Sequence, residues 1–449
     1  MSPRTRFRAS AARALRGVHP VRLVLVGYLA CVVAAWVLLA LPASQAVAGT
    51  SALDHLFTAT SAVSTTGLAT VSPPGTYSLF GELVVLLFIQ IGGIGYMSLG
   101  SFIVLSRGRR LSTSRSRLLA ADFSMPRSFA LDEFVRGVVV FTLAAETLGA
   151  LALWGLFSEA GVEAAFYQAV FHSVSAFCTA GFSLFDTSLE AFAGNTGVNA
   201  VIAALAYLGA IGFIVVVDVW RVWTGKQPRL TTTSRIILRL TFLLTVAGTV
   251  GIFLTEPAAI APTPALRWQA AFFQAMTAMT TVGFNTVPIS GLGMASLFVV
   301  LLLMIVGASP SGTGGGLKTT TLSAVYAVAR SVLRGEDAVT YRGRRVPTDR
   351  VLAAVASLAF YVAVLTVGLL CLTITESGAD FQVLAFEAAS ALGTVGLSAG
   401  VTGDLTALGK LVVVGLMFAG RLGPLSFGSA LFLRDQAPAA LEDEVEVVL

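Results

Sequence analysis

The chain alternates long apolar segments with shorter polar connections. A helix needs roughly 20 apolar residues to cross a bilayer, and eight segments reach or approach that length, at about 21–41, 79–104, 134–157, 197–220, 235–255, 294–307 with a continuation, 350–374 and 408–433. The first segment resembles a signal peptide, but its run from Leu23 to Leu41 exceeds the ~7–15-residue core of such peptides. We therefore expect eight membrane-spanning helices, the first of them retained.

Charged residues sort to opposite ends of these segments. Basic residues precede the first segment and follow the second, fourth and sixth, as in "SRGRRLSTSRSR" (Ser106–Arg117). The alternate connections are acidic, with residues such as Asp54, Glu159, Glu256 and Glu376. By the positive-inside rule, the basic connections and both termini are expected in the cytoplasm.

A motif recurs four times in the acidic connections. Each copy reads Phe, three residues, Ser or Thr, Ala, two residues, Thr, one residue, Gly, and then Phe or Leu. The copies, about 110 residues apart, are "FTATSAVSTTGL" (Phe57–Leu68), "FHSVSAFCTAGF" (Phe171–Phe182), "FQAMTAMTTVGF" (Phe273–Phe284) and "FEAASALGTVGL" (Phe386–Leu397). Packing of small residues between helices could explain one copy, but it is a poor explanation for four copies in one register.

The place of the motif predicts the architecture. Between two spans, each copy forms a short re-entrant helix, and irregular backbone at its end is tolerated only inside the protein or beside water. The carbonyl end of that helix carries partial negative charge, and glycine lets the following carbonyls turn toward a common axis. We expect an all-α membrane protein of four tandem helix–pore-helix–helix units, with eight transmembrane helices around a pseudo-fourfold central pore. The predicted parts are a basic cytoplasmic arm (1–19), pore units at 20–105, 130–225, 232–335 and 348–434, and an acidic tail (435–449).

A ring of carbonyl oxygens can replace the water shell of an alkali ion. The motif therefore predicts a filter in which main-chain carbonyls bind the transported K+, formed by Thr65, Thr66, Gly67, Thr179, Ala180, Gly181, Thr281, Val282, Gly283, Thr394, Val395 and Gly396. Asn285 is expected to brace the third copy. A further repeat position, occupied by Thr58, His172, Gln274 and Glu387, is expected to satisfy local donors or to meet outer water.

Composition agrees with a membrane protein and argues against other classes. Hydrophobic residues make up 56% of the chain and charged residues 12%, with a mean hydropathy of +0.84, whereas soluble proteins carry about 25% charged residues. The net charge of +5 comes from patches beside the spans and does not indicate nucleic-acid binding. The three cysteines fit no metal or disulfide spacing, and no catalytic set is visible. We expect neither an enzyme nor an organic cofactor.

A glycine-rich stretch, "GASPSGTGGGLKTTT" (Gly307–Thr321), looks like a phosphate-binding loop. That loop requires glycine directly before the lysine and a preceding strand, but Leu317 precedes Lys318 and an apolar helix leads in. The stretch aligns with "IGGIGYM" (Ile91–Met97), "LGAIGFI" (Leu208–Ile214) and "AGRLGPL" (Ala419–Leu425), at a level just below the filter. Because proline and repeated glycine cannot stay helical, we predict an intramembrane gating loop that includes Gly307, Pro310, Gly312, Gly314, Gly315, Gly316 and Lys318.

Two basic residues at this level are candidate gate elements. Lys318 ends the loop, where it either acts electrostatically on the pathway or extends to the cytoplasmic surface. Arg421 lies in the last span, roughly 20 Å from the outer face, where a charge is rarely without function. The alternative for Arg421 is an ion pair between helices, for which Glu146 is the candidate.

The four linked units resemble the superfamily of K+ transporters that includes bacterial TrkH and KtrB and the plant HKT proteins. The resemblance covers about residues 20–433, and eight spans make the chain more similar to KtrB. It implies a bacterial cytoplasmic membrane, an Arg421 that projects beneath the filter, and a preference for K+, because serine at the first filter glycine is associated with Na+ in that superfamily. It also implies a homodimer docked on a cytosolic RCK-type nucleotide-binding subunit similar to KtrA or TrkA.

Three functions remain open from the sequence. The preferred one is gated K+ uptake, and its close alternative is a Na+-conducting or weakly selective transporter of the same fold. An alternating-access carrier would have inverted repeats, whereas these four share one orientation. Lipid is a further expected partner, because anionic headgroups attract basic connections.

Overall fold

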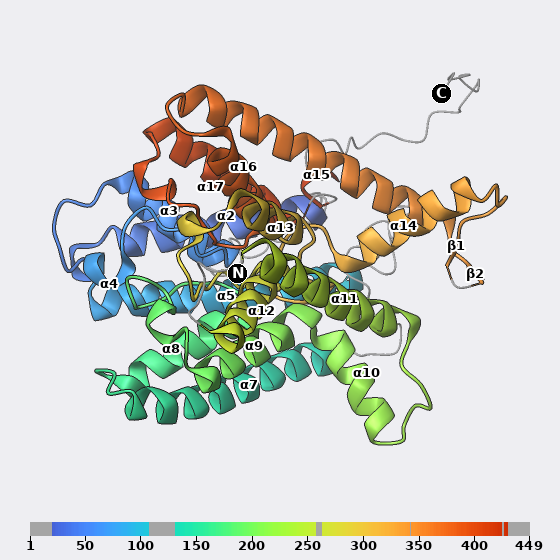
Figure 1. Cartoon of the computed structure of the whole chain (residues 1–449), viewed down its shortest axis with the longest axis horizontal. Helices are drawn as coiled ribbons and strands as arrows, with labels where there is room; N and C mark the ends of the chain where they lie inside the picture. The colour runs from blue at the N-terminus through green and yellow to red at the C-terminus, as the bar shows by residue number, and fades with distance from the viewer. Residues whose placement is uncertain (1–19, 107–130, 257–262, 342, 424–425, 430–449) are drawn as a thin grey trace, which may run out of the picture.

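The computed structural model describes residues 20–106, 131–256, 263–341, 343–423 and 426–429 (Figure 1). The predicted basic arm (1–19), most of the basic connection 106–117 and the acidic tail (435–449) lie outside the described residues. The described chain is mostly helical.

A repeated order of long and short helices organises the chain. The first group is α2 (Pro20–Leu39), α3 (Ala52–Ser64), the one-turn α4 (Pro73–Thr76) and α5 (Leu79–Ser106), and the second is α7 (Leu131–Glu159), α8 (Ala165–Phe177), α9 (Thr196–Ile211) and α10 (Phe213–Trp223). The third is α11 (Thr232–Thr255), α12 (Pro264–Thr280), α13 (Met294–Ile305) and α14 (Thr319–Leu333), and the fourth is α15 (Thr348–Thr375), α16 (Phe381–Gly393) and α17 (Ala407–Leu422).

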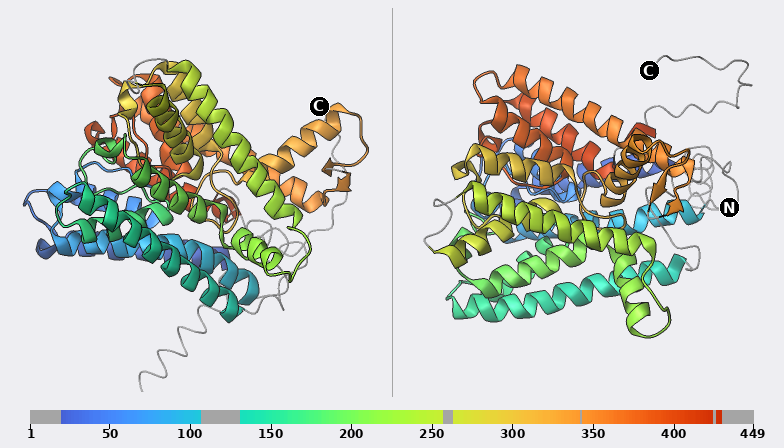
Figure 2. Two further views of the ribbon diagram at one scale, coloured as in Figure 1. Left: turned by 60° about the horizontal axis from the view of Figure 1, so that its bottom comes forward. Right: turned by 45° about the vertical axis from the view of Figure 1, so that its right-hand side comes forward.

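The groups contact one another in a closed order. Helix α5 packs against α7 and α8, α9 packs against α12, α13 packs against α16, and α17 returns to α3 (Figures 1 and 2). The last contact joins the two ends of the described chain, which lie far apart in sequence. A ring of this kind leaves the short helices α3, α8, α12 and α16 toward the inside.

Burial follows that arrangement. The phenylalanine that opens each repeat is at most 1% exposed, at Phe57, Phe171, Phe273 and Phe386. The long helices instead expose large apolar side chains, for example Leu148 (68%) on α7 and Phe242 (67%) on α11. Contiguous exposed apolar surface of this kind is unfavourable in water, and a surrounding bilayer removes that cost.

Three helices among the described residues are long and apolar enough to cross a membrane, namely Arg136–Glu159 of α7, α11 and α15. The pair α9–α10 would be a fourth, but it is bent by 97° at Gly212. At the other predicted spans, the described apolar helices are too short to meet this criterion. Helix α17 has 16 residues and contains Lys410 and Arg421.

Two details of the sequence prediction are wrong. The first is the expected span 197–220, which breaks at Gly212. In the expected span 408–433, α17 ends at Leu422, before Gly423, and residues 426–429 are helical again. Both glycines have positive φ (83° and 81°), which glycine adopts without the steric penalty of a side chain. The chain is also not purely α, because β1 (Thr340–Tyr341) and β2 (Arg344–Arg345) form a small antiparallel hairpin.

Candidate ion pathway

The end of each short helix has the same backbone conformation. The motif threonine is left-handed in all four copies, with φ between 50° and 60° at Thr65, Thr179, Thr281 and Thr394. Positive φ is rare for a β-branched residue, and such backbone strain clusters at functional sites. The amide of the next residue bonds to the carbonyl five residues earlier in every copy, at 2.8–3.1 Å, as in Thr66 to Ser61.

Each motif glycine lies against a main-chain carbonyl of the next copy, and the four contacts form a closed cycle. A Cβ built on Gly67 would overlap the carbonyl oxygen of Ala180, and one on Gly181 would overlap that of Val282. In the same way, Gly283 lies against the carbonyl of Val395, and Gly396 lies against that of Thr66, which closes the ring. We call these segments, 65–67, 179–181, 281–283 and 394–396, the Thr-x-Gly ring.

Hydroxyl groups lie beside the carbonyls in this ring. The Oγ1 atoms of Thr65, Thr281 and Thr394 are buried and have no hydrogen-bond partner among the described residues. Buried polar atoms almost always have a partner, so an unpaired set indicates a water or an ion. Neutral oxygens suit a monovalent alkali ion, and no described group of three or more His, Cys, Asp or Glu side chains could hold a metal.

The serine of the motif fixes the glycine main chain. Ser61 Oγ accepts from Gly67 N at 3.0 Å, and Ser390 Oγ accepts from Gly396 N at 3.1 Å. In the second copy, Ser175 Oγ donates to the carbonyl of Phe182 at 2.8 Å. In these three copies a side chain of the preceding helix holds the main chain of the ring. In the third copy, Thr277 occupies this position and its Oγ1 has no hydrogen-bond partner among the described residues.

The repeat position after the phenylalanine braces the outer side of the ring. His172 Nε2 lies 2.9 Å from Ser183 Oγ, Gln274 Nε2 donates to Thr286 Oγ1 at 3.1 Å, and Glu387 accepts from Ser398 Oγ at 2.8 Å. These three side chains and Thr58 are fully buried. Of the two alternatives expected for this position, the hydrogen bonds of His172, Gln274 and Glu387 therefore support local pairing and not contact with outer water. Asn285 braces the third copy as expected, because its Nδ2 donates to Glu190 Oε1 at 2.8 Å.

A buried loop lies directly beneath the ring. The glycine-rich loop (306–318) leaves α13, and every residue from 307 to 318 is buried. Thr313 Oγ1 lies 3.0 Å from Thr179 Oγ1 and also donates to the carbonyl of Phe177 at 3.1 Å. A Cβ on Gly314 would overlap Thr281 Oγ1, and one on Gly315 would overlap Thr394 Oγ1. The loop thus covers three of the four threonines, and glycine is required for that close approach.

The loop and the bend in α9–α10 satisfy each other's backbone groups. Because the helix breaks at Gly212, the carbonyls of Gly209 and Ala210 are free to accept from Thr313 N and Ser309 N, both at 3.0 Å. In return, Phe213 N donates to the carbonyl of Ser311 at 3.3 Å. Sequence reasoning missed this contact, although the second glycine of "LGAIGFI" was the available signal.

Arg421 connects the loop to the first group of helices. Its guanidinium donates to the carbonyl of Thr313 in the loop and to the carbonyl of Gly92 in α5. The side chain is 1% exposed. Glu146, the carboxylate considered as its partner, accepts a hydrogen bond from Gln90 Nε2 at 3.1 Å.

Lys318 turns back into the loop that it ends. Its Nζ donates to the carbonyl of Gly314 at 2.6 Å and lies 3.4 Å from that of Gly315, and the residue is 7% exposed. The alternative expectation, that this lysine extends to the surface, is therefore wrong. The ammonium group lies beneath the same part of the ring that the loop covers.

An ion pair at the acidic end joins the first and last groups. Lys410 Nζ lies 2.7 Å from Asp54 Oδ1. Burial would raise the pKa of the Asp54 carboxyl, but hydrogen bonds from Lys410, Ser51 and Thr70 outweigh it and hold that pKa below its usual value. The contact reinforces the closure between α17 and α3.

Comparison with known proteins gives consistent matches over nearly the whole chain. The family model TrkH, described as "Cation transport protein", matches residues 29–435. The chain is 35% identical to the Ktr system potassium uptake protein B of Vibrio alginolyticus over 97% of this chain and 95% of that protein. It is 32% identical to the Bacillus subtilis protein of the same name, over 91% and 92%.

Two further matches inform function and fold. The potassium/sodium uptake protein NtpJ of Enterococcus hirae is 30% identical over 94% of this chain and 95% of its own length. The crystal structure of the potassium transporter TrkH from Vibrio parahaemolyticus matches with a TM-score of 0.72, covering 92% of this chain and 84% of that chain at 21% identity. At that identity the match supports the fold alone.

Proposed function

Since the chain belongs to the TrkH family of cation transport proteins, we propose that it is the ion-conducting subunit of a Ktr-type potassium uptake system in a bacterial cytoplasmic membrane. The relatives at 30–35% identity are named as potassium or potassium/sodium uptake proteins. The proposed division into four pore units at 20–105, 130–225, 232–335 and 348–434 follows the repeat.

The Thr-x-Gly ring is the proposed selectivity filter. The observation that carries this proposal is the closed cycle in which each motif glycine lies against the carbonyl of the next copy, with three unpaired threonine hydroxyls beside it. Neutral oxygen atoms held at fixed separations can replace the hydration shell of K+. The ion is the substrate of this site, and it loses water from its hydration shell as it enters.

The glycine-rich loop (306–318) is the proposed gate. It is supported by its burial beneath the ring and by the contacts of Thr313, Gly314 and Gly315 with the threonines. Lys318 and Arg421 place two positive charges near this level, which disfavours a cation there. Opening requires the loop to leave the carbonyls of Gly209 and Ala210 and the guanidinium of Arg421.

A Na+-conducting or weakly selective transporter is the second candidate. The name of the E. hirae relative includes sodium as well as potassium. Glycine at all four ring positions favours K+ in this family, and ion competition separates the two candidates.

The names of the relatives bear on one aspect of assembly, the presence of a partner subunit. A Ktr "system" implies a further subunit, and we propose a homodimer bound to a cytosolic RCK-type nucleotide-binding subunit. Both termini and the basic connections would face that subunit, in accordance with the positive-inside rule.

The test is growth rescue of a K+-uptake-deficient bacterium at low K+, with Rb+ and Na+ uptake measured in the same cells. We expect rescue and Rb+ uptake that excess K+, but not Na+, suppresses. Equal suppression by Na+ would favour the second candidate. Absence of both growth rescue and ion uptake, with the protein present in the membrane and co-expressed with a Ktr-type regulatory subunit, would contradict the proposal.

A further inference from the structure

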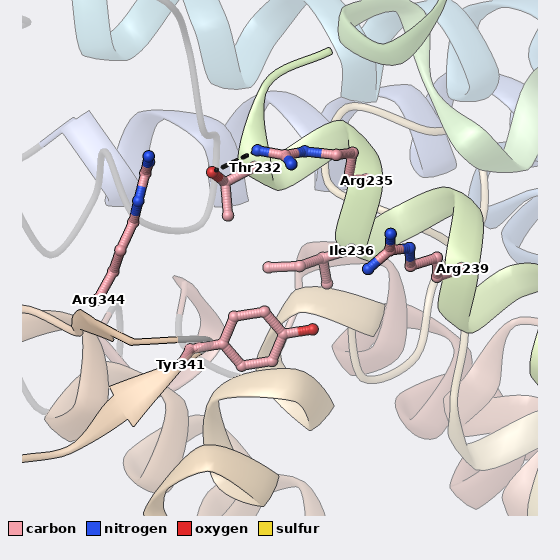
Figure 3. Close-up of a pocket in the computed structure, with 6 residues that line it drawn as sticks. All are labelled: Thr232, Arg235, Ile236, Arg239, Tyr341 and Arg344. Carbon is pink, nitrogen blue, oxygen red and sulfur yellow. Dashed lines mark hydrogen bonds between the residues drawn. The ribbon is translucent and has the colours of Figure 1, made fainter. Parts of the chain in front are cut away.

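An arginine-lined cleft lies away from the Thr-x-Gly ring, at the end of the molecule where α11 starts. One cavity of about 220 Å³ is lined by Thr232, Arg235, Ile236, Arg239, Tyr341 and Arg344. Figure 3 shows the α11 side chains on one side and those of the β1–β2 hairpin on the other, with Tyr341 between Arg344 and Arg239. Two elements that are distant in sequence therefore both contribute arginines to the wall of this cavity.

The charge in this cavity is not neutralised by the described protein. Among the described residues, no Asp or Glu lines the cavity, and the guanidinium groups of Arg239 and Arg344 form no hydrogen bond or ion pair. Arg235 donates to Thr232 Oγ1 at 3.4 Å. Like charges brought together in this way repel one another unless an anion binds between them. Guanidinium groups match phosphate oxygens in geometry as well as charge.

The start of α11 adds to the same potential. The helix begins at Thr232, and its first backbone amides carry the partial positive charge of a helix N-terminus. An anion in the cavity would interact with this end, with the arginines and with the Tyr341 hydroxyl.

A second cavity continues the first and is of different character. It has a volume of about 390 Å³ and shares Thr232, Ile236, Tyr341 and Arg344 with the first. Its wall between α14 and α15 contains four alanines beside hydroxyl side chains, namely Ala324, Ala327, Ala353 and Ala354 with Thr320, Thr321, Ser323 and Ser357. Arg345 and Arg350 line the same cavity. The combined cleft thus offers arginines next to small apolar side chains, which suits a phospholipid better than a free phosphate ion.

The cleft lies at the basic ends of the long helices, the cytoplasmic side by the positive-inside rule. Anionic lipids give the cytoplasmic leaflet a negative surface potential. We propose that the cleft is a binding site for an anionic phospholipid, whose phosphate group lies among the arginines of the first cavity and whose acyl chain lies along the alanines of α14 and α15.

The site also touches the helix that continues the glycine-rich loop. Thr320 and Thr321 line the second cavity, and they follow Lys318 and Thr319 at the start of α14. A lipid there would contact α14 two residues beyond the loop. The binding proposal itself does not depend on the transport function.

The test measures lipid binding to the purified full chain by native mass spectrometry. Dioleoyl phosphatidylglycerol is compared with dioleoyl phosphatidylcholine and with inorganic phosphate. The variant Arg239→Gln/Arg344→Gln is compared with Arg229→Gln/Arg334→Gln, which removes the same charge from exposed arginines that do not line the cleft.

We expect wild-type protein to retain phosphatidylglycerol in preference to phosphatidylcholine. At about 1 kcal/mol per arginine near a membrane surface, the cleft variant should bind phosphatidylglycerol roughly tenfold or more weakly, and the control pair should bind it nearly as wild type. Equal losses in both variants, or no loss in the cleft variant, would overturn the proposal. Displacement of phosphatidylglycerol by equimolar inorganic phosphate would also overturn it, because the occupant would then be a free anion.

Discussion

The Thr-x-Gly ring and the level directly beneath it are built from the same fourfold repeat, yet only the ring is uniform. In the ring, four threonines share one left-handed conformation and four glycines make the same contact with the next copy. Beneath it, α5 continues through the aligned position, α9 breaks at Gly212, α13 gives way to a buried loop, and α17 ends before Gly423.

The difference fits the proposed separation of filter and gate. If the ring is the filter, its oxygens must be equivalent around one ion, which agrees with the same geometry in each copy. If the loop is the gate, it must have a second available conformation, and the geometry of the other three copies at this level does not have to match it. Arg421 lies at this lower level, and the residues aligned with it in the other copies are Gly93, Ala210 and Ala308. At this position, the fourth copy alone has a charged residue.

The largest expected effect comes from breaking the uniform ring. In Gly283→Ser, the new Cβ would overlap the carbonyl of Val395 at a residue with φ of 82°. We expect Rb+ uptake to fall at least tenfold or to lose its discrimination against Na+, since the Val395 oxygen must move. Gly415→Ser is the control, because nothing lies within 4 Å of its Cβ position. Unchanged uptake and selectivity in Gly283→Ser would show that the ring does not contact the ion.

A smaller effect of opposite sign is expected from the level beneath. Arg421→Met keeps side-chain volume but removes the donors to Thr313 and Gly92. Hydrogen bonds to charged groups contribute about 1.5–3 kcal/mol each, so the docked loop should be destabilised and Rb+ flux should rise several-fold to tenfold in proteoliposomes that lack a regulatory subunit. If flux falls or does not change, while Rb+ still competes with K+, Arg421 does not hold the loop closed.

A substitution at the bend in α9–α10 should also raise Rb+ flux, but by less than Arg421→Met. Gly212→Ala places a Cβ against the main chain of Ser311 and Gly312, at a residue with φ of 83°. We expect a rise in flux of about twofold to fivefold, because strain of about 1–3 kcal/mol opposes a conformation that is essentially restricted to glycine. Gly155→Ala, in open space on α7, is the matched control. An increase of the same size in the control would remove the evidence for coupling.

The smallest effect concerns the closure of the ring of helices. Asp54→Asn removes the ion pair with Lys410 and should lower the free energy of unfolding by about 1 kcal/mol or less. Since the Asp54 carboxyl has a lowered pKa, this contribution is present above its ordinary pKa and is lost as the pH falls through the lowered value. A double-mutant cycle with Lys410→Met, followed by thermal unfolding in detergent, measures it. Additive losses would show that the pair contributes nothing.

The repeat made much of the ring predictable. Because Phe57, Phe171, Phe273 and Phe386 begin copies of equal length, one alignment gives the place where each short helix ends. The left-handed conformation of the motif threonines was not predicted, because the unusual backbone angles were expected at the glycines. The loop was predictable for a different reason, since proline followed by repeated glycine excludes a helix. The break at Gly212 was not predicted, because an apolar segment with isolated glycines is compatible with a continuous span, as α5 with Gly92 and Gly93 demonstrates.

The sequence by itself therefore determined the membrane character, the fourfold motif and the places where helix is excluded, since these depend on residue type and local spacing. Only the tertiary structure decided which copy lies next to which, that the loop covers Thr179, Thr281 and Thr394, and that Arg421 reaches both Thr313 and Gly92. These contacts join residues that lie from 33 positions (Thr281 and Gly314) to 329 positions (Gly92 and Arg421) apart in the sequence. Their geometry depends on how buried backbone groups find partners once the helices have packed, and no local pattern specifies that choice.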